Sequence, residues 1–148
     1  MKKIDLHIHT NSTVSDYPFE FDFSKLKQYV ETLDIACIAI TNHNTFDLKQ
    51  YLKIKDDLDI VVFPGIEIDL EGGHLLVISD NSDLSEINDF SKKCDRVSQL
   101  IKTKDDDITV EQFADIFPSL DKFLLIPHYH KRPIVKTETI RKINTLIS

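Results

Sequence analysis

Two histidines separated by one residue, His7 and His9, lie in the first apolar segment of the chain. On a β-strand, residues two apart project from the same side about 7 Å apart, so two imidazoles there can share one metal ion. A pair of solvated histidines on a half-exposed strand would give the same pattern, and the motif alone leaves both interpretations open. Asp5 fits the same alternation, so its carboxylate is a candidate to orient a metal-bound imidazole.

Further imidazoles and carboxylates recur along the chain at or near the ends of other apolar runs. They are His43, Glu67, Asp69, His74 and His128. Each has an ordinary explanation as a satisfied or solvent-exposed side chain, although a carboxylate on an apolar strand must be paired, hydrogen-bonded or metal-bound. Taken together they predict a metal site. The mixture of imidazole and carboxylate favours zinc, manganese or iron over calcium or magnesium.

The elements that must position these residues follow from the hydrophobic pattern, in which short apolar runs alternate with longer amphipathic segments. Strands are predicted over 2–8, 35–43, 59–70, 74–78 and 122–130. Helices are predicted over 23–33, 45–57, 84–101, 109–117 and 135–147, with Ser24 and Thr109 in capping positions. Gly72-Gly73 suits a hairpin turn, and Pro64-Gly65 indicates a kink or bulge. This order is typical of a parallel sheet with crossover helices, whose functional groups collect at the carboxyl ends of strands.

Composition narrows the class of protein. The formal net charge of −7 argues against charge-driven nucleic-acid binding, although a metal-lined pocket could still hold a nucleotide or a nucleic-acid end. No apolar run is long enough to span a membrane, and the N-terminus has no secretion signal. Cys37 and Cys94 lack the spacing of a metal or redox motif. We therefore expect a cytoplasmic protein without a membrane partner, and one domain over 1–148.

The segments DLHIHTNS, TNHNT, PGIEID, GGHLLVI and IPHYH, in this order, resemble the motifs of the PHP (polymerase and histidinol phosphatase) superfamily. The resemblance implies a distorted, TIM-like (β/α)7 barrel whose strand ends bind two or three divalent transition metal ions (Zn, Mn or Fe) and hydrolyse phosphate esters. It implies metal ligands at His7, His9, Asp16, His43, Glu67, His74 and His128. Asp16 lies somewhat later than the family's acidic ligand, and Asn42 replaces an aspartate beside the site.

One family motif is absent, a late Asp-x-His segment, because no aspartate follows Asp121 and no histidine follows His130. We therefore expect a partial barrel of about five strands with crossover helices that lacks the last strands and leaves a strand edge unpaired. The chain would be an N-terminal part of a longer protein, or a shortened domain whose gap is filled by His130 or a partner chain. Its partners would accordingly be the rest of a longer chain or a second copy that pairs with the edge strand.

The expected function is metal-dependent hydrolysis of a phosphate mono- or diester, such as a nucleotide, a nucleic-acid end or a small phosphate ester. Arg132 is a candidate clamp for the phosphate and His130 a candidate general acid for the leaving group. The alternative is a catalytically degenerate module that serves as a scaffold or regulatory domain of a larger protein, with an ATPase as one conceivable fusion. A related amidohydrolase would normally use a lysine as the metal bridge, and Glu67 fits the PHP pattern better.

Overall fold

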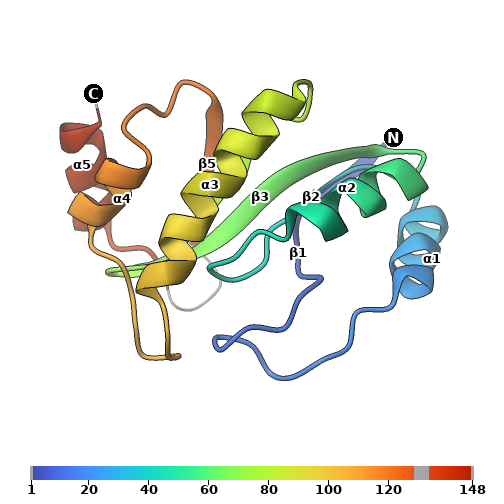
Figure 1. Ribbon diagram of the computed structural model, residues 1–148, viewed down its shortest axis with the longest axis horizontal. Coiled ribbons are helices and arrows are strands. Elements are labelled where there is room, and N and C mark those ends of the chain that lie inside the picture. Colours follow the sequence, from blue (N-terminus) through green and yellow to red (C-terminus); the bar gives the residue numbers. More distant parts are fainter. Residues whose placement is uncertain (1, 129–133, 148) are drawn as a thin grey trace.

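The computed structural model describes residues 2–128 and 134–147. It is an α/β structure built on one curved, mixed sheet of five strands, ordered as in the sequence (Figure 1). The strands are β1 (Lys3–Ile8), β2 (Ile35–Ile40), β3 (Val61–Leu70), β4 (Gly73–Ser79) and β5 (Phe123–Pro127). The helices are α1 (Phe23–Leu33), α2 (Leu48–Asp57), α3 (Leu84–Leu100), α4 (Val110–Ile116) and α5 (Thr137–Leu146). The predicted class and number of strands are confirmed.

The sheet is mixed, whereas the order of elements is typical of a parallel sheet with crossover helices. Strands β1, β2 and β3 run parallel, and α1 and α2 make the two crossovers. Strand β4 then pairs antiparallel with both β3 and β5. The reversal occurs at the predicted hairpin, where Gly72 and Gly73 take positive φ angles of 85° and 141° that favour glycine.

Strand β3 changes partner at Pro64-Gly65, where the sequence indicates a kink or bulge. Residues 61–64 pair with β2, and residues 65–70 pair with β4. A Cβ atom on Gly65 would lie 2.8 Å from Thr41 Cγ2 and 3.0 Å from the Ile40 carbonyl oxygen, so only glycine fits this approach. The second half of β3 therefore extends past the end of β2 and carries Glu67 with it.

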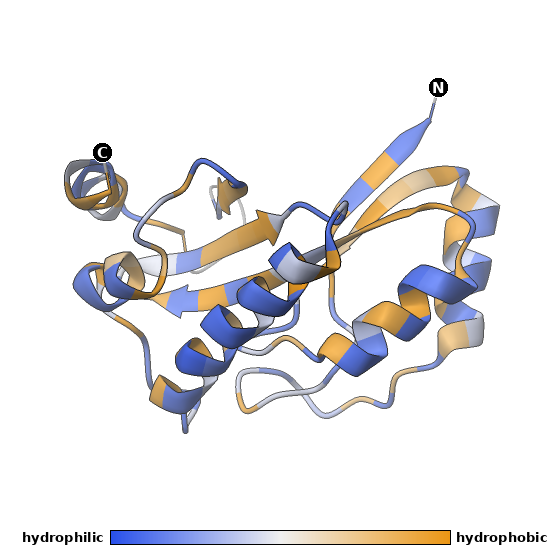
Figure 2. Ribbon diagram, turned by 45° about the horizontal axis from the view of Figure 1, so that its top comes forward, coloured by the Kyte–Doolittle hydropathy of each residue, from blue (hydrophilic) through white to orange (hydrophobic). Residues whose placement is uncertain are grey.

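The two faces of the sheet differ in chemistry. Helices α1, α2 and α3 contact one face, and both α2 and α3 carry hydrophilic and hydrophobic residues, as helices that cover a sheet do (Figure 2). Under them lies a buried apolar core that includes Ile38, Val62, Ile66 and Val77. Alternate strand residues face the other side, where β3 and β4 carry the acidic and histidine residues of interest. Among the described residues no helix is both long and apolar enough to cross a membrane.

Strand β1 contains a bulge that reverses part of its predicted alternation. Asp5 pairs with Ile38 and Ile8 with Ile40, so three steps on β1 match two on β2. Asp5 therefore faces the helices, where its carboxylate accepts hydrogen bonds from the Tyr29 hydroxyl at 2.6 Å and the His7 backbone N–H at 3.1 Å. The expectation that Asp5 shares a face with His7 and His9 is wrong, because the extra residue turns both histidines to the other face.

Two helices begin later or on other caps than the sequence pattern indicates. Asp22, not Ser24, caps α1 by accepting from the backbone N–H groups of Ser24 and Lys25. Asp47 caps α2, which begins at Leu48 because the preceding residues form the turn that carries His43. Each aspartate directly precedes the first helical residue, whereas Ser24 already lies within the first turn of α1. The Thr109 cap of α4 is confirmed, and it forms a full capping box.

Candidate metal centre

The centre of the site is Glu67 on β3, which is only 1% exposed. Three ring nitrogens surround its Oε2 atom: His7 Nε2 and His9 Nε2 each at 2.7 Å, and His43 Nε2 at 3.4 Å. The other oxygen, Oε1, is approached by two more histidines. Their atoms are His74 Nδ1 at 3.0 Å and His128 Nε2 at 3.1 Å. One buried carboxylate thus has five imidazoles around it.

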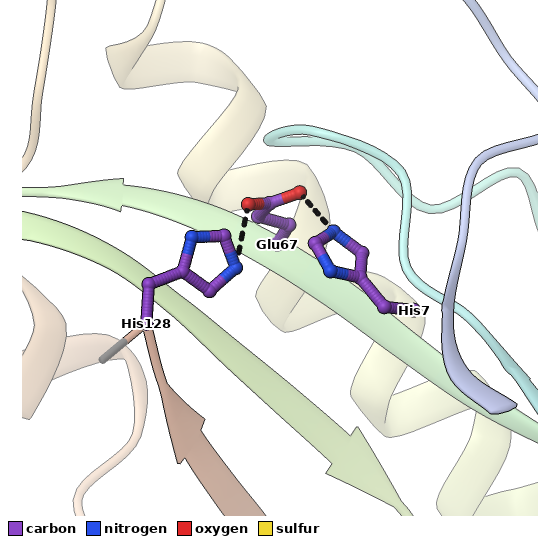
Figure 3. A group of neighbouring side chains, drawn as sticks. All are labelled: His7, Glu67 and His128. Atoms are coloured by element: carbon purple, nitrogen blue, oxygen red, sulfur yellow. Dashed lines mark hydrogen bonds and ion pairs between the residues drawn. The ribbon is translucent and has the colours of Figure 1, made fainter. Parts of the chain in front are cut away.

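Five parts of the chain supply these rings and the carboxylate. His7 and His9 lie at the end of β1, His43 after β2, His74 at the start of β4 and His128 after β5. Figure 3 shows His7 and His128 on opposite sides of Glu67, each directed at a different carboxylate oxygen. Because β1 and β5 are the two edge strands, the curvature of the sheet brings its opposite edges together at this site.

The loop after β2 is held against β3 almost as an extra strand. The Glu67 backbone N–H donates to the Asn42 carbonyl oxygen, and the Asn44 N–H donates to the Glu67 carbonyl oxygen. His43 is fixed between these two bonds. Asn42 also ties in the end of β1, because its side-chain oxygen accepts from the backbone N–H groups of Thr10 and Asn11. Asn42 therefore lies beside the cluster and positions its backbone.

Asp16 reaches the cluster from the long loop after β1. Its Oδ1 atom lies 3.0 Å from His9 Nδ1 and 3.9 Å from His43 Nε2. Its Oδ2 atom accepts from the Thr13 backbone N–H and hydroxyl, both at 2.9 Å, and these bonds fix the carboxylate. The seven residues to which the sequence resemblance gives metal-ligating roles are therefore brought to one place.

Asp69 is a member of the cluster for which the sequence gives no definite role. Its Oδ1 atom lies 3.2 Å from His43 Nδ1 and 3.0 Å from His74 Nε2. Its Oδ2 atom accepts from the Ser15 hydroxyl at 2.6 Å and the Asn44 side-chain amide at 2.7 Å. Sequence reasoning missed Ser15 and Asn44, and the signal that could have found them is only their closeness to Asp16 and His43.

Histidines and carboxylates of the cluster shift one another's pKa values. Burial raises the pKa of Glu67, but hydrogen bonds from His7, His74 and His9 outweigh it and hold that pKa well below its usual value. Burial lowers the pKa of His9, but Glu67 and Asp16 outweigh it and raise that pKa above 6.5. The pKa of His74 is raised in the same way, against burial, chiefly by Glu67. The Glu67 carboxylate therefore stays ionised and attracts positive charge.

The donor set fits divalent cations. Three groups have ligand atoms within 4.8 Å of one another: His7, Glu67 and His128; His9, His43 and Glu67; and His43, Asp69 and His74. A carboxylate offers about four lone-pair sites. Five ring nitrogens lie around Glu67, so hydrogen bonds to this carboxylate cannot satisfy all of them. His43 Nδ1 and Asp69 Oδ1 are buried and lie 3.2 Å apart without hydrogen-bond alignment. Convergence of this kind, with imidazole and carboxylate ligands, suits a transition metal better than a hydrogen-bond network alone.

The two residues expected to act on the substrate, His130 and Arg132, lie outside the described residues. Their roles stay predictions. A cavity of about 540 Å³ opens beside His43 and offers room for a bound molecule. Its wall carries hydroxyl and amide side chains with some apolar ones, and among them are Asn11, Ser12, Val14, Phe19 and Thr45.

Few known proteins are similar to this chain. No protein family matches the chain, and no curated protein matches it. Among solved structures, the chain is similar to a protein from Bifidobacterium adolescentis whose crystal structure is described as that of "a putative metal-dependent phosphoesterase". It is 14% identical, with a TM-score of 0.49, and the match covers 97% of this chain and 74% of that one. We therefore base the function on the arrangement of the side chains.

Proposed function

We propose that the protein is a metal-dependent phosphoesterase of the PHP type, with a partial (β/α)7 barrel, that hydrolyses a phosphate mono- or diester. The observation that carries the proposal is the buried Glu67 carboxylate with five imidazoles around it, contributed by separate strand ends and loops. A nucleotide, a nucleic-acid end or a small phosphate ester would be the substrate.

Glu67 would hold divalent ions together with His7 and His128 on one side and with His9 and His43 on the other. Zinc, manganese and iron are the candidates. Such ions, when bound, lower the pKa of a water molecule and neutralise phosphoryl oxygens. Asp16 holds His9 Nδ1 at 3.0 Å, which leaves Nε2 of that ring directed at Glu67.

The chain's other residues would handle the substrate. The cavity beside His43 would take the organic part of the ester, with the phosphate directed at the cluster. Arg132 would grip the phosphate through two parallel hydrogen bonds, and a ring nitrogen of His130 would give a proton to the leaving oxygen. Both follow His128 closely in the sequence.

Residues 1–148 would form one domain, the N-terminal part of the barrel. Within the described residues β1 and β5 each pair on one side only. Strands from the rest of a longer chain, or from a second copy, would pair with these edges.

A second candidate is a catalytically degenerate module that binds metal but acts as a scaffold or regulatory domain. The formal net charge of −7, which would repel an anionic ester, favours it. The two candidates differ in turnover and not in metal content.

The test is hydrolysis of a generic phosphomonoester and a generic phosphodiester by the purified protein, loaded in turn with zinc, manganese and iron. We expect turnover with at least one ion and its loss in a Glu67→Gln variant. The matched control is Asp80→Asn, which alters an exposed carboxylate after β4. Stoichiometric metal without turnover on either ester would instead support the scaffold.

A further inference from the structure

We propose that Asp69 is a positioning residue that sets which ring nitrogen of His43 and of His74 faces Glu67. The inference rests on the proposed metal site and adds a part to it. Asp69 Oδ1 lies 3.2 Å from His43 Nδ1 and 3.0 Å from His74 Nε2. The opposite nitrogens of the same rings, His43 Nε2 and His74 Nδ1, lie 3.4 Å and 3.0 Å from the Glu67 carboxylate. Each ring therefore spans the space between the two carboxylates.

Hydrogen bonds to one side-chain oxygen and to the backbone N–H hold Asp69 in place. Ser15 and Asn44 donate to Oδ2, at 2.6 Å and 2.7 Å, and so occupy that oxygen. The Asn44 side-chain oxygen also accepts from the Asp69 backbone N–H at 2.8 Å. Asn44 takes a left-handed φ of 55°, which asparagine tolerates better than most residues, and its backbone N–H donates to the Glu67 carbonyl oxygen. This leaves Oδ1 directed at the two rings.

The position of Asp69 decides which nitrogen of each neutral imidazole carries the proton. Such a ring carries a proton on one nitrogen and a lone pair on the other, whereas an ionised carboxylate can only accept. Neither contact of Asp69 Oδ1 is aligned as a hydrogen bond, but a negative charge 3.0–3.2 Å from a ring nitrogen favours a proton over a lone pair on that nitrogen. Asp69 therefore favours N–H on His43 Nδ1 and on His74 Nε2. The lone pairs then lie on the nitrogens that face Glu67, where a metal ion needs them. Ligating histidines commonly direct their second N–H at a carboxylate, and Asp69 lies where such a carboxylate would be.

Direct metal binding by Asp69 is the competing arrangement, because Asp69, His43 and His74 also form a compact group. In that case His43 Nδ1 would carry the lone pair. A neutral ring has one nitrogen lone pair to give, so His43 cannot serve this group and the group with His9 and Glu67 at once. His43 Nε2 faces two carboxylates, Glu67 at 3.4 Å and Asp16 at 3.9 Å, which favours metal binding through Nε2.

The unaltered protein can decide between the two arrangements by histidine ¹⁵N NMR. Two-bond ¹⁵N–¹H spectra of the zinc-loaded chain report which nitrogen of each ring carries the proton. We expect the proton on Nδ1 of His43 and on Nε2 of His74. Protons on the opposite nitrogens, or zinc on His43 Nδ1, would overturn the proposal. This readout requires neither a variant nor any hydrolytic activity.

An Asp69→Asn variant tests the consequence for metal binding. Ser15 and Asn44 both donate to Oδ2, so an amide at this position would turn its oxygen toward them and its NH₂ toward the rings. The acceptor beside His43 and His74 would become a donor and favour the wrong protonated nitrogen. We expect zinc affinity, measured by competition with a chromophoric chelator, to fall about 10–100-fold. An affinity within twofold of the unaltered protein would contradict the proposal.

Two further variants control for charge and for folding. Asp80→Asn removes one negative charge at the exposed far end of β4 and should leave zinc affinity unchanged. Ser15→Ala keeps the Asp69 carboxylate but loosens one of its bonds, so a smaller loss than that of Asp69→Asn is expected. If Asp69→Asn shows no cooperative thermal transition, the variant is not folded and its zinc affinity is not used. Ser15→Ala and the NMR spectra of the unaltered chain then test the role of Asp69. If zinc binding follows these expectations but no ester is cleaved, only the proposed hydrolysis fails.

Discussion

His7 in β1 and His128 after β5 place their ring centroids 5.1 Å apart, although β1 and β5 are opposite edges of the sheet. Each ring contacts a different oxygen of Glu67, which lies on the central strand β3. A flat sheet of five strands would hold these edges far apart, since neighbouring strands are about 4.8 Å apart. The curvature of the sheet and the assembly of the site are therefore one and the same feature.

Metal removal should destabilise the fold, because the ions would bind the folded chain and join its two edge strands. At a free zinc concentration 1,000 times Kd, one site adds about 4.1 kcal/mol to the free energy of unfolding. We expect the Tm measured by circular dichroism to fall when a chelator is added and to recover with zinc. A His7→Ala, His9→Ala double variant should lose this response. A Tm that is the same with zinc and with chelator would contradict metal binding.

The metal-free protein should lose stability as pH rises through the neutral range. The folded-state pKa values of His9 and His74 are raised above 6.5, mainly because Glu67 outweighs burial. Their contribution is fully present below the unfolded pKa of about 6.5 and is lost as pH rises through the folded values. Zinc-loaded protein should show the opposite slope, because protons compete with metal for imidazole. Urea unfolding at several pH values, with chelator and with zinc, measures both slopes, and equal slopes would refute the expectation.

The β1 bulge should be sensitive to Asp5, whose carboxylate holds the His7 backbone N–H. An Asp5→Ala variant should lose about 1 kcal/mol in the free energy of unfolding and also bind zinc more weakly, since the bulge directs His7 and His9 into the site. Tyr29→Phe removes only the hydroxyl that donates to Asp5 and serves as the milder control. Unchanged zinc affinity in Asp5→Ala would show that the bulge holds without this carboxylate.

The close approach at Gly65 should not tolerate a side chain. In Gly65→Ala the new methyl group would meet Thr41 Cγ2 at 2.8 Å, and overpacking of this kind costs about 1–3 kcal/mol. Thr41→Ser removes that methyl group, so the double variant should recover part of the loss in urea unfolding. The Ile40 carbonyl oxygen at 3.0 Å keeps the recovery incomplete. Full stability in Gly65→Ala alone would contradict the steric account.

Sequence patterns predicted the elements and the residues of the cluster because both leave local signals. Short apolar runs identified β2 and β3, and the Gly72-Gly73 pair identified the hairpin. The imidazoles were recognisable because strand ends collect functional groups whatever the exact packing.

Long-range relationships left no such signal. The bulge that turns Asp5 to the helices depends on pairing between β1 and β2. The alternation of apolar and polar residues in β1 does not reveal it. The place of β5 beside β4 depends on how α3 and α4 return the chain, which periodicity does not encode. Asp69 has a role only once Ser15 and Asn44 lie beside it, and both are unremarkable loop residues in the sequence.

Anomalous diffraction at the zinc absorption edge, from crystals grown with zinc, tests the central claim most directly. Peaks should lie between Glu67 and the rings of His7, His9, His43 and His128, at about 2.0–2.2 Å from the nearest nitrogen and oxygen atoms. Fully loaded crystals with no peak within bonding distance of the Glu67 carboxylate would contradict the account.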